Sequence, residues 1–315
     1  MRRIWVLHNP LSGRPNSAAK VEQGVEALAR RGLSVRLERP TAMEPFRRAA
    51  RAAIAAQADA VLVAGGDGSV GAIAAELAGS PVALGVLPVG TANVWAKELG
   101  LLPLAWDHSQ ALEQDALSLL EGQTRLADMG RCNGHLFLLW AGAGLDAFIM
   151  ERLNTQRWIA RHLGLLYNTA AAFVMAYQWR GADMRVVVGE REVSGHYLLA
   201  AISNINWYGG GLLNFRHGAR LDDGQMDVWL FEGGTYAEAL AHAARLFRGQ
   251  HEGHPGVTHL TGDRVDIYTS RPQAIQIDGE PLARADHMSV QVIPQILRVL
   301  LPSKSLDKLF SPEGR

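Results

Sequence analysis

The alternation of apolar runs with amphipathic segments over the first hundred residues is the feature that most limits the fold of this chain. Each apolar run of strand length is followed by helical spacing, with the runs at 3–9, 33–39, 60–66 and 81–90 and the helical segments at 16–32, 44–57, 68–79 and 93–100. Strands this apolar are buried on both faces, and a helix between consecutive strands makes neighbouring strands parallel. The sequence therefore predicts an α/β N-terminal domain with a parallel sheet.

After about residue 125 the pattern changes to short strands separated by turn residues. These strands are expected at 135–144, 183–190, 196–204, 225–232, 263–270, 273–280 and 288–294. A helical stretch at roughly 147–180 interrupts them. Such a series of strands is typical of an antiparallel sandwich or curled sheet. We predict two domains, 1–125 with the α/β fold and 126–315 with a β-rich, sandwich-like fold.

Composition limits the kind of protein. The 315 residues carry 31 Lys and Arg against 31 Asp and Glu, and this balance excludes the positive excess that bulk nucleic-acid binding requires. Cys132 is the single cysteine, which excludes an intramolecular disulfide and favours a reducing, cytoplasmic compartment. The apolar segment 163–179 is shorter than the ~20 residues of a spanning helix, so we predict no membrane span and leave contact with a bilayer surface open. A homodimer is possible, but no feature of the sequence argues for one.

The stretch "GGDGS" at 65–69 places Asp67 between two glycines, where a buried strand ends and a helix begins. Glycines allow backbone N–H groups to approach anionic oxygens, and the N-terminus of a helix favours negative charge. Asp67 repels a phosphate unless a cation lies between them, most simply Mg²⁺ with its waters. No lysine follows as in a P-loop, and no GxGxxG follows the first strand as in a dinucleotide site. A tight strand-to-helix turn without a ligand is the alternative.

Two further loops are expected at the same edge of the sheet. "HNPLSG" follows the first strand and "PVGTAN" follows the fourth, and both contain small or amide residues. Ligands of open parallel sheets bind beyond the carboxyl ends of the strands. Together with GGDGS, these loops predict one ligand site at this edge.

The ordered set GGDGS, PVGTAN and, near the C-terminus, "DGE" resembles the diacylglycerol-kinase catalytic-domain family, which includes bacterial lipid kinases, diacylglycerol kinases and sphingosine kinases. The resemblance extends over nearly the whole chain, through "NPLSG" (9–13), "ADMGRCNGHLFLLWAGAGLDA" (127–147) and "SNINWYGGG" (203–211). GGDG by itself is shared with NAD kinases and phosphofructokinases, and an N-terminal domain like theirs is implied. The resemblance also implies ATP as phosphoryl donor and a lipid hydroxyl as acceptor.

The same resemblance implies roles for individual residues. The nucleotide would be bordered by Asn9, Ser12, Gly13, Thr41, Gly65, Gly66, Asp67, Gly68, Ser69, Val70, Gly71 and Thr91. Asp146 would meet the polar headgroup of the lipid. A structural Mg²⁺ would bind the Asp223 side chain and the carbonyls of Arg220 and Gln225, whereas the Asp-Asp-Gly turn by itself favours a β-hairpin. The residues from 305 onward would return to the first domain.

A second acidic cluster lies in "QAIQIDGEPL", where Asp278 and Glu280 flank Gly279 after a predicted strand. Phosphorylation of an alcohol needs a proton acceptor near the attacking hydroxyl, while cations and backbone dipoles stabilise the transferred group. We predict that one of the two carboxylates accepts this proton, with Glu280 slightly favoured, and that the other holds water or metal. A strand-ending turn without chemistry explains Asp278 and Gly279 but does not require Glu280.

The function predicted is an ATP- and Mg²⁺-dependent lipid kinase of phospholipid biosynthesis, cytoplasmic and in peripheral contact with the membrane. Two alternatives stay open: an NAD-kinase-like enzyme with a nucleotide acceptor, and a non-catalytic protein that binds nucleotide or lipid for regulation. For Thr41, a helix N-cap before the segment 44–57 is as well supported as a nucleotide contact. The residues do not identify the lipid, which could be diacylglycerol, a sphingoid base or a related lipid.

Overall fold

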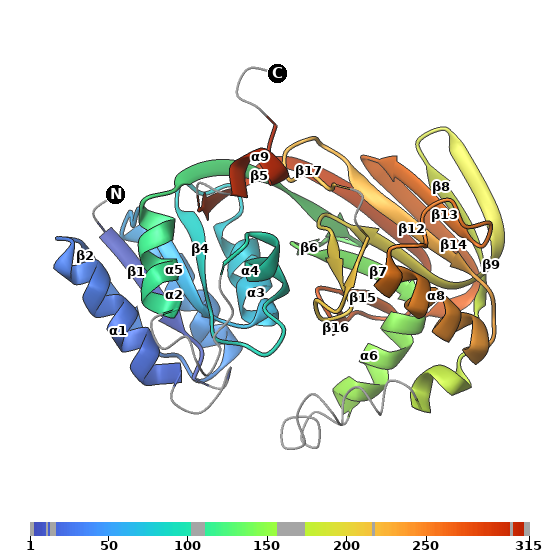
Figure 1. The fold of residues 1–315 in the computed structure, drawn as a ribbon, viewed down its shortest axis with the longest axis horizontal. Helices are drawn as coiled ribbons and strands as arrows, with labels where there is room; N and C mark the ends of the chain where they lie inside the picture. The colour runs from blue at the N-terminus through green and yellow to red at the C-terminus, as the bar shows by residue number, and fades with distance from the viewer. Residues whose placement is uncertain are drawn as a thin grey trace.

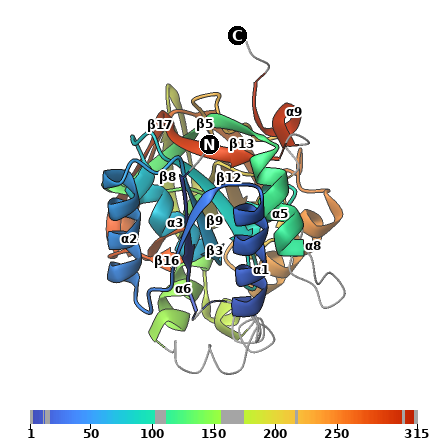
Figure 2. The same cartoon turned by 90° about the vertical axis from the view of Figure 1, so that its left-hand side faces the viewer.

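A computed structural model describes residues 3–10, 12, 17–101, 111–155, 174–215, 218–302 and 305–311. The N-terminal part alternates strands with helices in the order β1 (Arg3–His8), α1 (Ser17–Arg30), β2 (Ser34–Glu38), α2 (Met43–Ala55), β3 (Ala60–Gly65), α3 (Asp67–Leu77), β4 (Ala83–Pro88), α4 (Val94–Glu98) and α5 (Ala111–Leu120). Its strands pair in parallel in the order β4-β3-β1-β2, so the predicted parallel sheet is confirmed. Figure 2 shows α1 and α5 on one face of these strands and α2 on the other.

Burial of apolar side chains explains why these strands lie at the centre of the N-terminal part. Every residue of β3 and β4 is buried. They share one apolar cluster with the helices, in which Leu28, Phe46 and Ile73 are almost fully buried. Removal of apolar surface from water is the main favourable term of folding. The core thereby fixes the edge at which β1, β3 and β4 end, where the predicted ligand loops begin.

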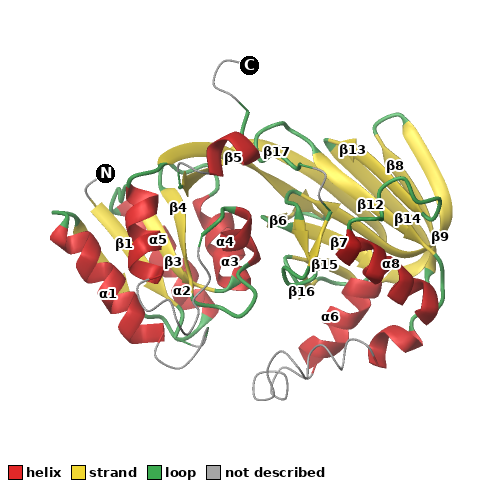
Figure 3. Ribbon diagram, in the orientation of Figure 1, coloured by secondary structure: helices red, strands yellow, loops and turns green. Residues whose placement is uncertain are grey.

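The C-terminal part is β-rich and antiparallel, as predicted (Figure 3). Its strands are β5 (Gln123–Cys132), β6 (His135–Phe137), β7 (Trp140–Gly144), β8 (Ala182–Val188), β9 (Arg191–Ser203), β10 (Trp207–Tyr208), β11 (Leu213–Asn214), β12 (Met226–Glu232), β13 (Val257–Gly262), β14 (Arg264–Gln273), β15 (Ile275–Ile277), β16 (Glu280–Pro281) and β17 (Ala285–Leu301). A second apolar cluster fills this part. The helix α6 (Leu145–Thr155) interrupts the strands inside the predicted helical stretch, and most of the remainder of that stretch lies outside the described residues.

The strand β17 joins the two parts of the molecule (Figure 1). It pairs with β14 and β5 and then runs parallel to β4, with Val299 opposite Leu84. The expected strand stopped at Pro294, whereas β17 continues for seven more residues. The register shifts between Ile293 and Leu297, and Gln295 adopts a left-handed φ of 50°. This irregularity accommodates a proline within the strand, because proline donates no ladder hydrogen bond.

Several further elements are not predicted from the sequence pattern. They are the strands β5, β10, β11 and β13 and the helices α5, α8 (Tyr236–Arg248) and α9 (Leu306–Leu309). The signal for α8 was present, because Thr235 and Glu238 form a capping box and Gly249 ends the helix with a φ of 68°. The predicted boundary between 125 and 126 lies within β5, so the division into two domains remains a proposal.

The C-terminal residues lie against the N-terminal part. The helix α9 (Leu306–Leu309) is followed by Phe310, and both Leu309 and Phe310 belong to the apolar cluster of the parallel strands. The hydroxyl of Ser305 donates a hydrogen bond to the carbonyl of Leu99. The carbonyl of Leu309 accepts the N–H of Leu221 at 2.8 Å. The apolar contacts of Leu309 and Phe310 and the hydrogen bond of Ser305 support the proposed return of the chain end to the first domain.

Candidate active site

The loop GGDGS forms the junction between β3 and α3. Gly66 is the N-cap residue of α3, and it has no side chain that could cap the first turn of the helix. Asp67 is the first helical residue, and Gly68 behind it is exposed. An N-terminus without a side-chain cap leaves N–H groups for water or a ligand and favours negative charge. This end of α3 is therefore suited to an anion such as a phosphate.

The loop PVGTAN packs directly on GGDGS. A Cβ atom added to Gly90 would lie 2.4 Å from the Cα atom of Gly66, so only glycine fits at position 90. Asn93 adopts a left-handed φ of 50° and donates from Nδ2 to the carbonyl of Gly90 at 2.8 Å. Backbone contact within the protein thus explains the glycines at positions 66 and 90 in part. Thr91, in the same loop, is exposed.

Asp67 connects the two loops. Its Oδ1 accepts the backbone N–H of Trp95 in the first turn of α4 at 3.0 Å. Burial raises the pKa of Asp67, and the N–H groups of Val94 and Trp95 oppose this rise. Asp67 therefore caps α4 from outside the helix, a structural contact that the sequence pattern did not indicate. The same carboxylate is partly buried, so a cation beside it would be favourable.

The loop after β1 reaches the same junction. Asn9 donates from Nδ2 to the hydroxyl of Ser69 at 2.9 Å, and the N–H of Ser12 donates to the carbonyl of Asn9 at 3.0 Å. Ser69 is buried and Val70 lies beneath it in the core. A Cβ atom added to Gly65 would lie 2.8 Å from the Cβ of Ser69. The predicted nucleotide residue Gly13 lies outside the described residues.

Thr41 is exposed and precedes α2 by two residues. The N-cap of α2 is Ala42, with extended backbone and no side-chain cap. The interpretation of Thr41 as the N-cap is therefore wrong, because the helix begins one residue too late for its hydroxyl to reach the N2 or N3 amide. A nucleotide contact for Thr41 remains a prediction.

The DGE turn connects β15 and β16. Asp278 has a φ of 49° and Gly279 a φ of 81°, so the chain reverses within two residues. The Asp278 carboxylate accepts three backbone N–H groups, from Leu138 at 2.9 Å, Leu139 at 2.7 Å and Trp140 at 3.2 Å. Burial is the main reason that the pKa of Asp278 rises to about 6, and the charge of Asp67 adds to the rise. Asp278 thus holds the start of β7, whereas Glu280 is exposed.

The two acidic motifs lie against each other although more than two hundred residues separate them in sequence. A Cβ atom added to Gly71 would lie 2.8 Å from Oδ2 of Asp278. A Cβ atom added to Gly68 would lie 3.9 Å from Oε1 of Glu280. The glycine face of the first turns of α3 therefore receives the DGE turn. The structure brings together Asp67, Asp278 and Glu280, as the sequence predicted for one site.

Two side chains that the sequence pattern missed support the DGE turn. Gln276 is almost fully buried, accepts the N–H of Gly279 at 2.8 Å and donates to Oδ2 of Asp146 at 2.9 Å. The Tyr208 hydroxyl donates to the same oxygen of Asp146 at 2.6 Å. Burial raises the pKa of Asp146, and these donors oppose that rise. Asp146 is therefore a member of a network that ends at the DGE turn.

The helix α4 also contacts the C-terminal part. Glu98 accepts the backbone N–H groups of Asn206 at 3.1 Å and Trp207 at 3.2 Å. The ammonium group of Lys97 lies 3.4 Å from the ring centroid of Trp207 and donates to the carbonyl of Gly211 at 2.5 Å. Because α4 begins at PVGTAN, these contacts couple that loop to the strand-rich part.

The candidate structural metal residues Arg220, Asp223 and Gln225 line one small cavity of about 170 Å³ together with Asp227. Oδ1 of Asp223 accepts the N–H of Gln225 at 3.0 Å. The hairpin interpretation is wrong, because the strand directly before the turn, β11, pairs with β10, whereas β12 after the turn pairs with β9 and β13. In the described part of the chain, no group of three or more His, Cys, Asp or Glu is arranged to hold a metal ion.

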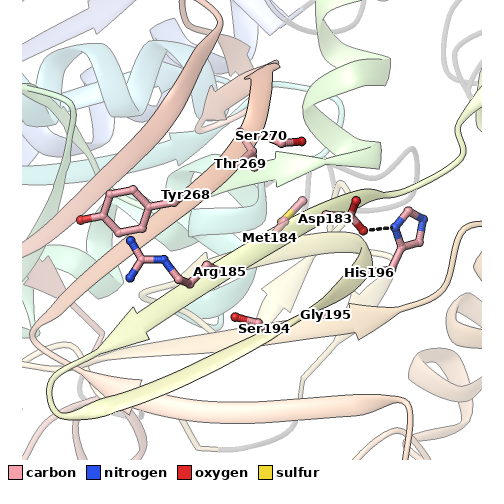
Figure 4. Close-up of a pocket in the computed structure, with 9 residues that line it drawn as sticks. All are labelled: Asp183, Met184, Arg185, Ser194, Gly195, His196, Tyr268, Thr269 and Ser270. Atoms are coloured by element: carbon pink, nitrogen blue, oxygen red, sulfur yellow. Dashed lines mark hydrogen bonds and ion pairs between the residues drawn. The ribbon is translucent and has the colours of Figure 1, made fainter.

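A hollow of about 620 Å³ lies elsewhere, on β8, β9 and β14 (Figure 4). Asp183 and His196 face each other there, with Oδ1 and Nδ1 at 2.7 Å. Both side chains are largely exposed, and exposed pairs contribute little stability. None of the residues predicted for nucleotide or lipid lines this hollow, so it is not the candidate active site.

The fold and the site define a class: a parallel α/β part with glycine loops at its edge, joined to a β-rich part that presents an acidic turn. Residues 3–132 match the model of the diacylglycerol kinase catalytic domain, and residues 140–301 match the YegS C-terminal NAD kinase beta sandwich-like domain. The chain belongs to the diacylglycerol kinase catalytic-domain family of lipid kinases.

Relatives and solved structures match over almost the full length. The chain is 25% identical to the diacylglycerol kinase of Bacillus subtilis, over 89% of this chain and 90% of the relative. It is 28% identical to the diacylglycerol kinase of Mycobacterium tuberculosis, over 95% of each. A diacylglycerol kinase structure from Bacillus anthracis superposes with a TM-score of 0.71 at 15% identity, covering 97% of this chain and 98% of that one, which supports the fold. No helix among the described residues has the length and apolar character to cross a bilayer.

Proposed function

We propose that this protein is an ATP- and Mg²⁺-dependent lipid kinase that transfers the γ-phosphate of ATP to a lipid hydroxyl. The family and the relatives named diacylglycerol kinase support a kinase. The proposed acceptor is diacylglycerol, a sphingoid base or a related lipid, and the proposed place of action is the cytoplasmic surface of a membrane, in phospholipid biosynthesis.

One observation carries this proposal: the carboxylates of the DGE turn lie beside the N-terminal turn of α3. Gly68 and Gly71 leave room for Glu280 and Asp278, so an anion at the helix N-terminus would have a carboxylate next to it. Phosphoryl transfer needs this combination, because donors must neutralise the phosphate while a base receives the proton of the attacking hydroxyl. A turn without chemistry does not require Glu280 at this place.

In the proposed reaction, Glu280 accepts the proton of the lipid hydroxyl while the oxygen of that hydroxyl bonds to the γ-phosphorus. The bond from that phosphorus to the bridging oxygen breaks, and ADP leaves. Asp278 positions the turn, because its two oxygens already accept three N–H groups. An ionised carboxylate has about four lone-pair sites, and the backbone uses most of those of Asp278, so we assign the proton acceptor to the exposed Glu280.

The residues present fit Mg²⁺ at Asp67. Mg²⁺ prefers carboxylate oxygens, keeps several waters and is commonly bound by one or two carboxylates plus phosphates of the substrate. Burial disfavours the ionised form of Asp67, and a bound cation would favour it. Bound there, Mg²⁺ would neutralise charge on the phosphate oxygens.

Two variants of Asp67 separate its structural contact from its charge. Asp67→Asn keeps an oxygen that accepts the N–H of Trp95, so we expect an unchanged melting temperature and a loss of turnover of ~10²-fold or more. Asp67→Ala also removes the hydrogen bond, which is worth about 1.5–3 kcal/mol for a charged acceptor, so its melting temperature should fall. Calorimetry and a kinetic assay measure both effects. If Asp67→Asn keeps the turnover of the wild type, the negative charge of Asp67 is not required for the reaction.

Replacement of Gln276 tests the network behind the DGE turn. Gln276→Leu removes the acceptor of the Gly279 N–H and one of the donors to the Asp146 carboxylate. We expect kcat to fall by ~10-fold or more while KM for ATP changes little, because the turn moves but the α3 junction does not. Gln291→Leu, on the exposed side of β17, is the control. An equal fall in both variants contradicts a positioning role.

The proposed function is tested by incubating the protein with labelled ATP, Mg²⁺ and a total lipid extract and separating the products by chromatography. A labelled phospholipid supports the proposal and identifies the acceptor. A parallel reaction with NAD addresses the nucleotide-kinase alternative, and labelled NADP would overturn the lipid assignment. Nucleotide binding without any labelled product would favour a regulator.

A further inference from the structure

Exposed apolar side chains gather around α8. Seven large apolar residues are exposed in the described part of the chain, and five of them lie on α8 or on segments next to it: Val174, Tyr177, Leu212, Leu240 and Phe247. The ring of Tyr177 lies 5.9 Å from that of Tyr236 at the start of α8. Leu212 directly precedes β11, which contacts α8. We name these five residues the α8 surface.

The helix itself is apolar on two sides. His242 and Leu246 are buried against the C-terminal strands. Leu240 and Phe247 lie on a different side, which they share with Tyr236 at helical spacing, and their side chains are 39% and 71% exposed. A helix on the surface of a soluble domain normally turns polar residues to water. Exposed apolar side chains that share one side of a helix therefore indicate a surface that binds a partner.

Positive charge borders the α8 surface. Arg248 follows Phe247 in the last turn of α8, and Arg180 follows the helical residues 174–178. The one acidic residue of α8, Glu238, lies at the other end and accepts the N–H groups of Gly234 and Thr235 at 3.0 and 2.9 Å. Helices that lie in the interface of anionic membranes typically combine phenylalanine and leucine with arginine.

Packing connects the α8 surface to the candidate active site. Trp179, two residues after Tyr177, packs on Phe148 of α6 with ring centroids 4.9 Å apart. The first turn of α6 contains Asp146, which accepts the hydrogen bond of Gln276 behind the DGE turn. The α8 surface thus lies beside the helix that supports the site. In Figure 1, α8 lies on the outside of the C-terminal strands.

We infer that the α8 surface docks on a lipid bilayer that contains anionic lipids. Leu240 and Phe247 enter the region of the acyl chains, and the arginines lie at the level of the head-group phosphates. The inference rests on the proposed function in one respect, because an acceptor dissolved in a bilayer requires the enzyme to bind there. Binding itself needs neither ATP nor turnover.

The test is sedimentation of the full chain with vesicles of phosphatidylcholine and about 30 mol % phosphatidylglycerol in ~0.1 M NaCl. Leu240→Ser/Phe247→Ser should weaken binding at least ~10-fold, because two inserted side chains are lost. Met43→Ser/Leu126→Ser removes two exposed apolar residues far from α8 and should bind like the wild type. Binding of the Leu240/Phe247 variant at wild-type strength, or equal losses in both variants, overturns the inference.

A second pair of variants tests the charge. Arg180→Gln/Arg248→Gln should weaken binding by ~5-fold or more at ~0.1 M NaCl and by less at ~1 M NaCl, because salt screens the attraction. Arg131→Gln/Arg191→Gln changes the net charge equally on exposed strand residues and should have little effect. Equal effects of the two charge changes overturn the placement of the surface.

Two further outcomes are decisive. If sedimentation velocity shows a wild-type dimer that Leu240→Ser/Phe247→Ser converts to a monomer while vesicle binding is unchanged, the surface binds a second copy and the inference is overturned. Activity on a water-soluble, short-chain acceptor separates the two proposals. Variants that lose vesicle binding but keep this activity support the docking surface, whereas a wild type that binds vesicles but phosphorylates no lipid contradicts only the proposed function.

Discussion

Replacement of Glu280 by glutamine should lower kcat for phosphorylation of the lipid acceptor by ~10²-fold or more, because an amide cannot accept the proton of the attacking hydroxyl. Glu280 is exposed, so the variant should keep the melting temperature of the wild type. Its KM for ATP should change little, since the side chain lies beside Gly68 and not within the loops that are proposed to hold the nucleotide. Steady-state kinetics with saturating ATP and Mg²⁺ measure the effect.

Glu190→Gln is the matched control, because Glu190 is an exposed glutamate at the turn between β8 and β9. It should leave kcat unchanged. An unchanged kcat in Glu280→Gln would remove Glu280 as the base. The role would then move to Asp278, whose oxygens the backbone N–H groups of Leu138 to Trp140 already occupy.

Asp278→Asn should also lower kcat by roughly 10-fold or more, through the geometry of the turn. The amide offers one acceptor oxygen in place of two, and its NH₂ group meets an N–H donor of the segment from Leu138 to Trp140. Because β7 begins in that segment and pairs with β15, the DGE turn should shift relative to α3.

The stability of the wild type relative to this variant should depend on pH with a definite sign. The pKa of Asp278 rises from 3.8 to about 6 in the folded protein. The folded state therefore binds a proton that the unfolded state lacks between these two values. This stabilisation is complete below about pH 4, amounts to up to ~3 kcal/mol, and is lost as the pH rises through about 6.

Asp278→Asn has no such proton. The unfolding free energy of the wild type minus that of Asp278→Asn should therefore increase as the pH falls from about 8 to 5. Urea denaturation at several pH values measures this difference. Asp286→Asn, at an exposed position of β17, should give a difference with little slope over the same range. A flat difference for Asp278→Asn would mean that its carboxyl group titrates normally in the folded protein.

The fold was largely predictable because its signals are local. The apolar runs of β1 to β4 and the helical spacing between them predict a parallel sheet, and the structure confirms it. The β-rich character of the second part is confirmed for the same reason. The extension of β17 beyond Pro294 was not predictable, because the strand passes a proline only with the help of a shift in register.

The candidate site was likewise predictable only in part. Glycines at 66, 68 and 90 and acids at 67, 278 and 280 are visible in the sequence, and the structure gathers them. Their individual contacts were not predictable: Asp67 caps α4, Asp278 holds the start of β7, and Gln276 supports the turn. The Thr41 cap failed because a helix start is uncertain by a residue or more from pattern alone.

The primary structure alone determines the parallel strands of the N-terminal part, the antiparallel strands of the C-terminal part and the acidic and glycine-rich motifs. These features depend on periodicity and turn residues, which act between neighbours along the chain. Tertiary structure decided which carboxylate is occupied by backbone donors and which faces the helix N-terminus. The contacts responsible join residues that are 28 to 140 positions apart. Such contacts exist only after segments that are distant in the sequence have packed together, because burial and hydrogen-bond geometry depend on the whole fold and not on any local segment.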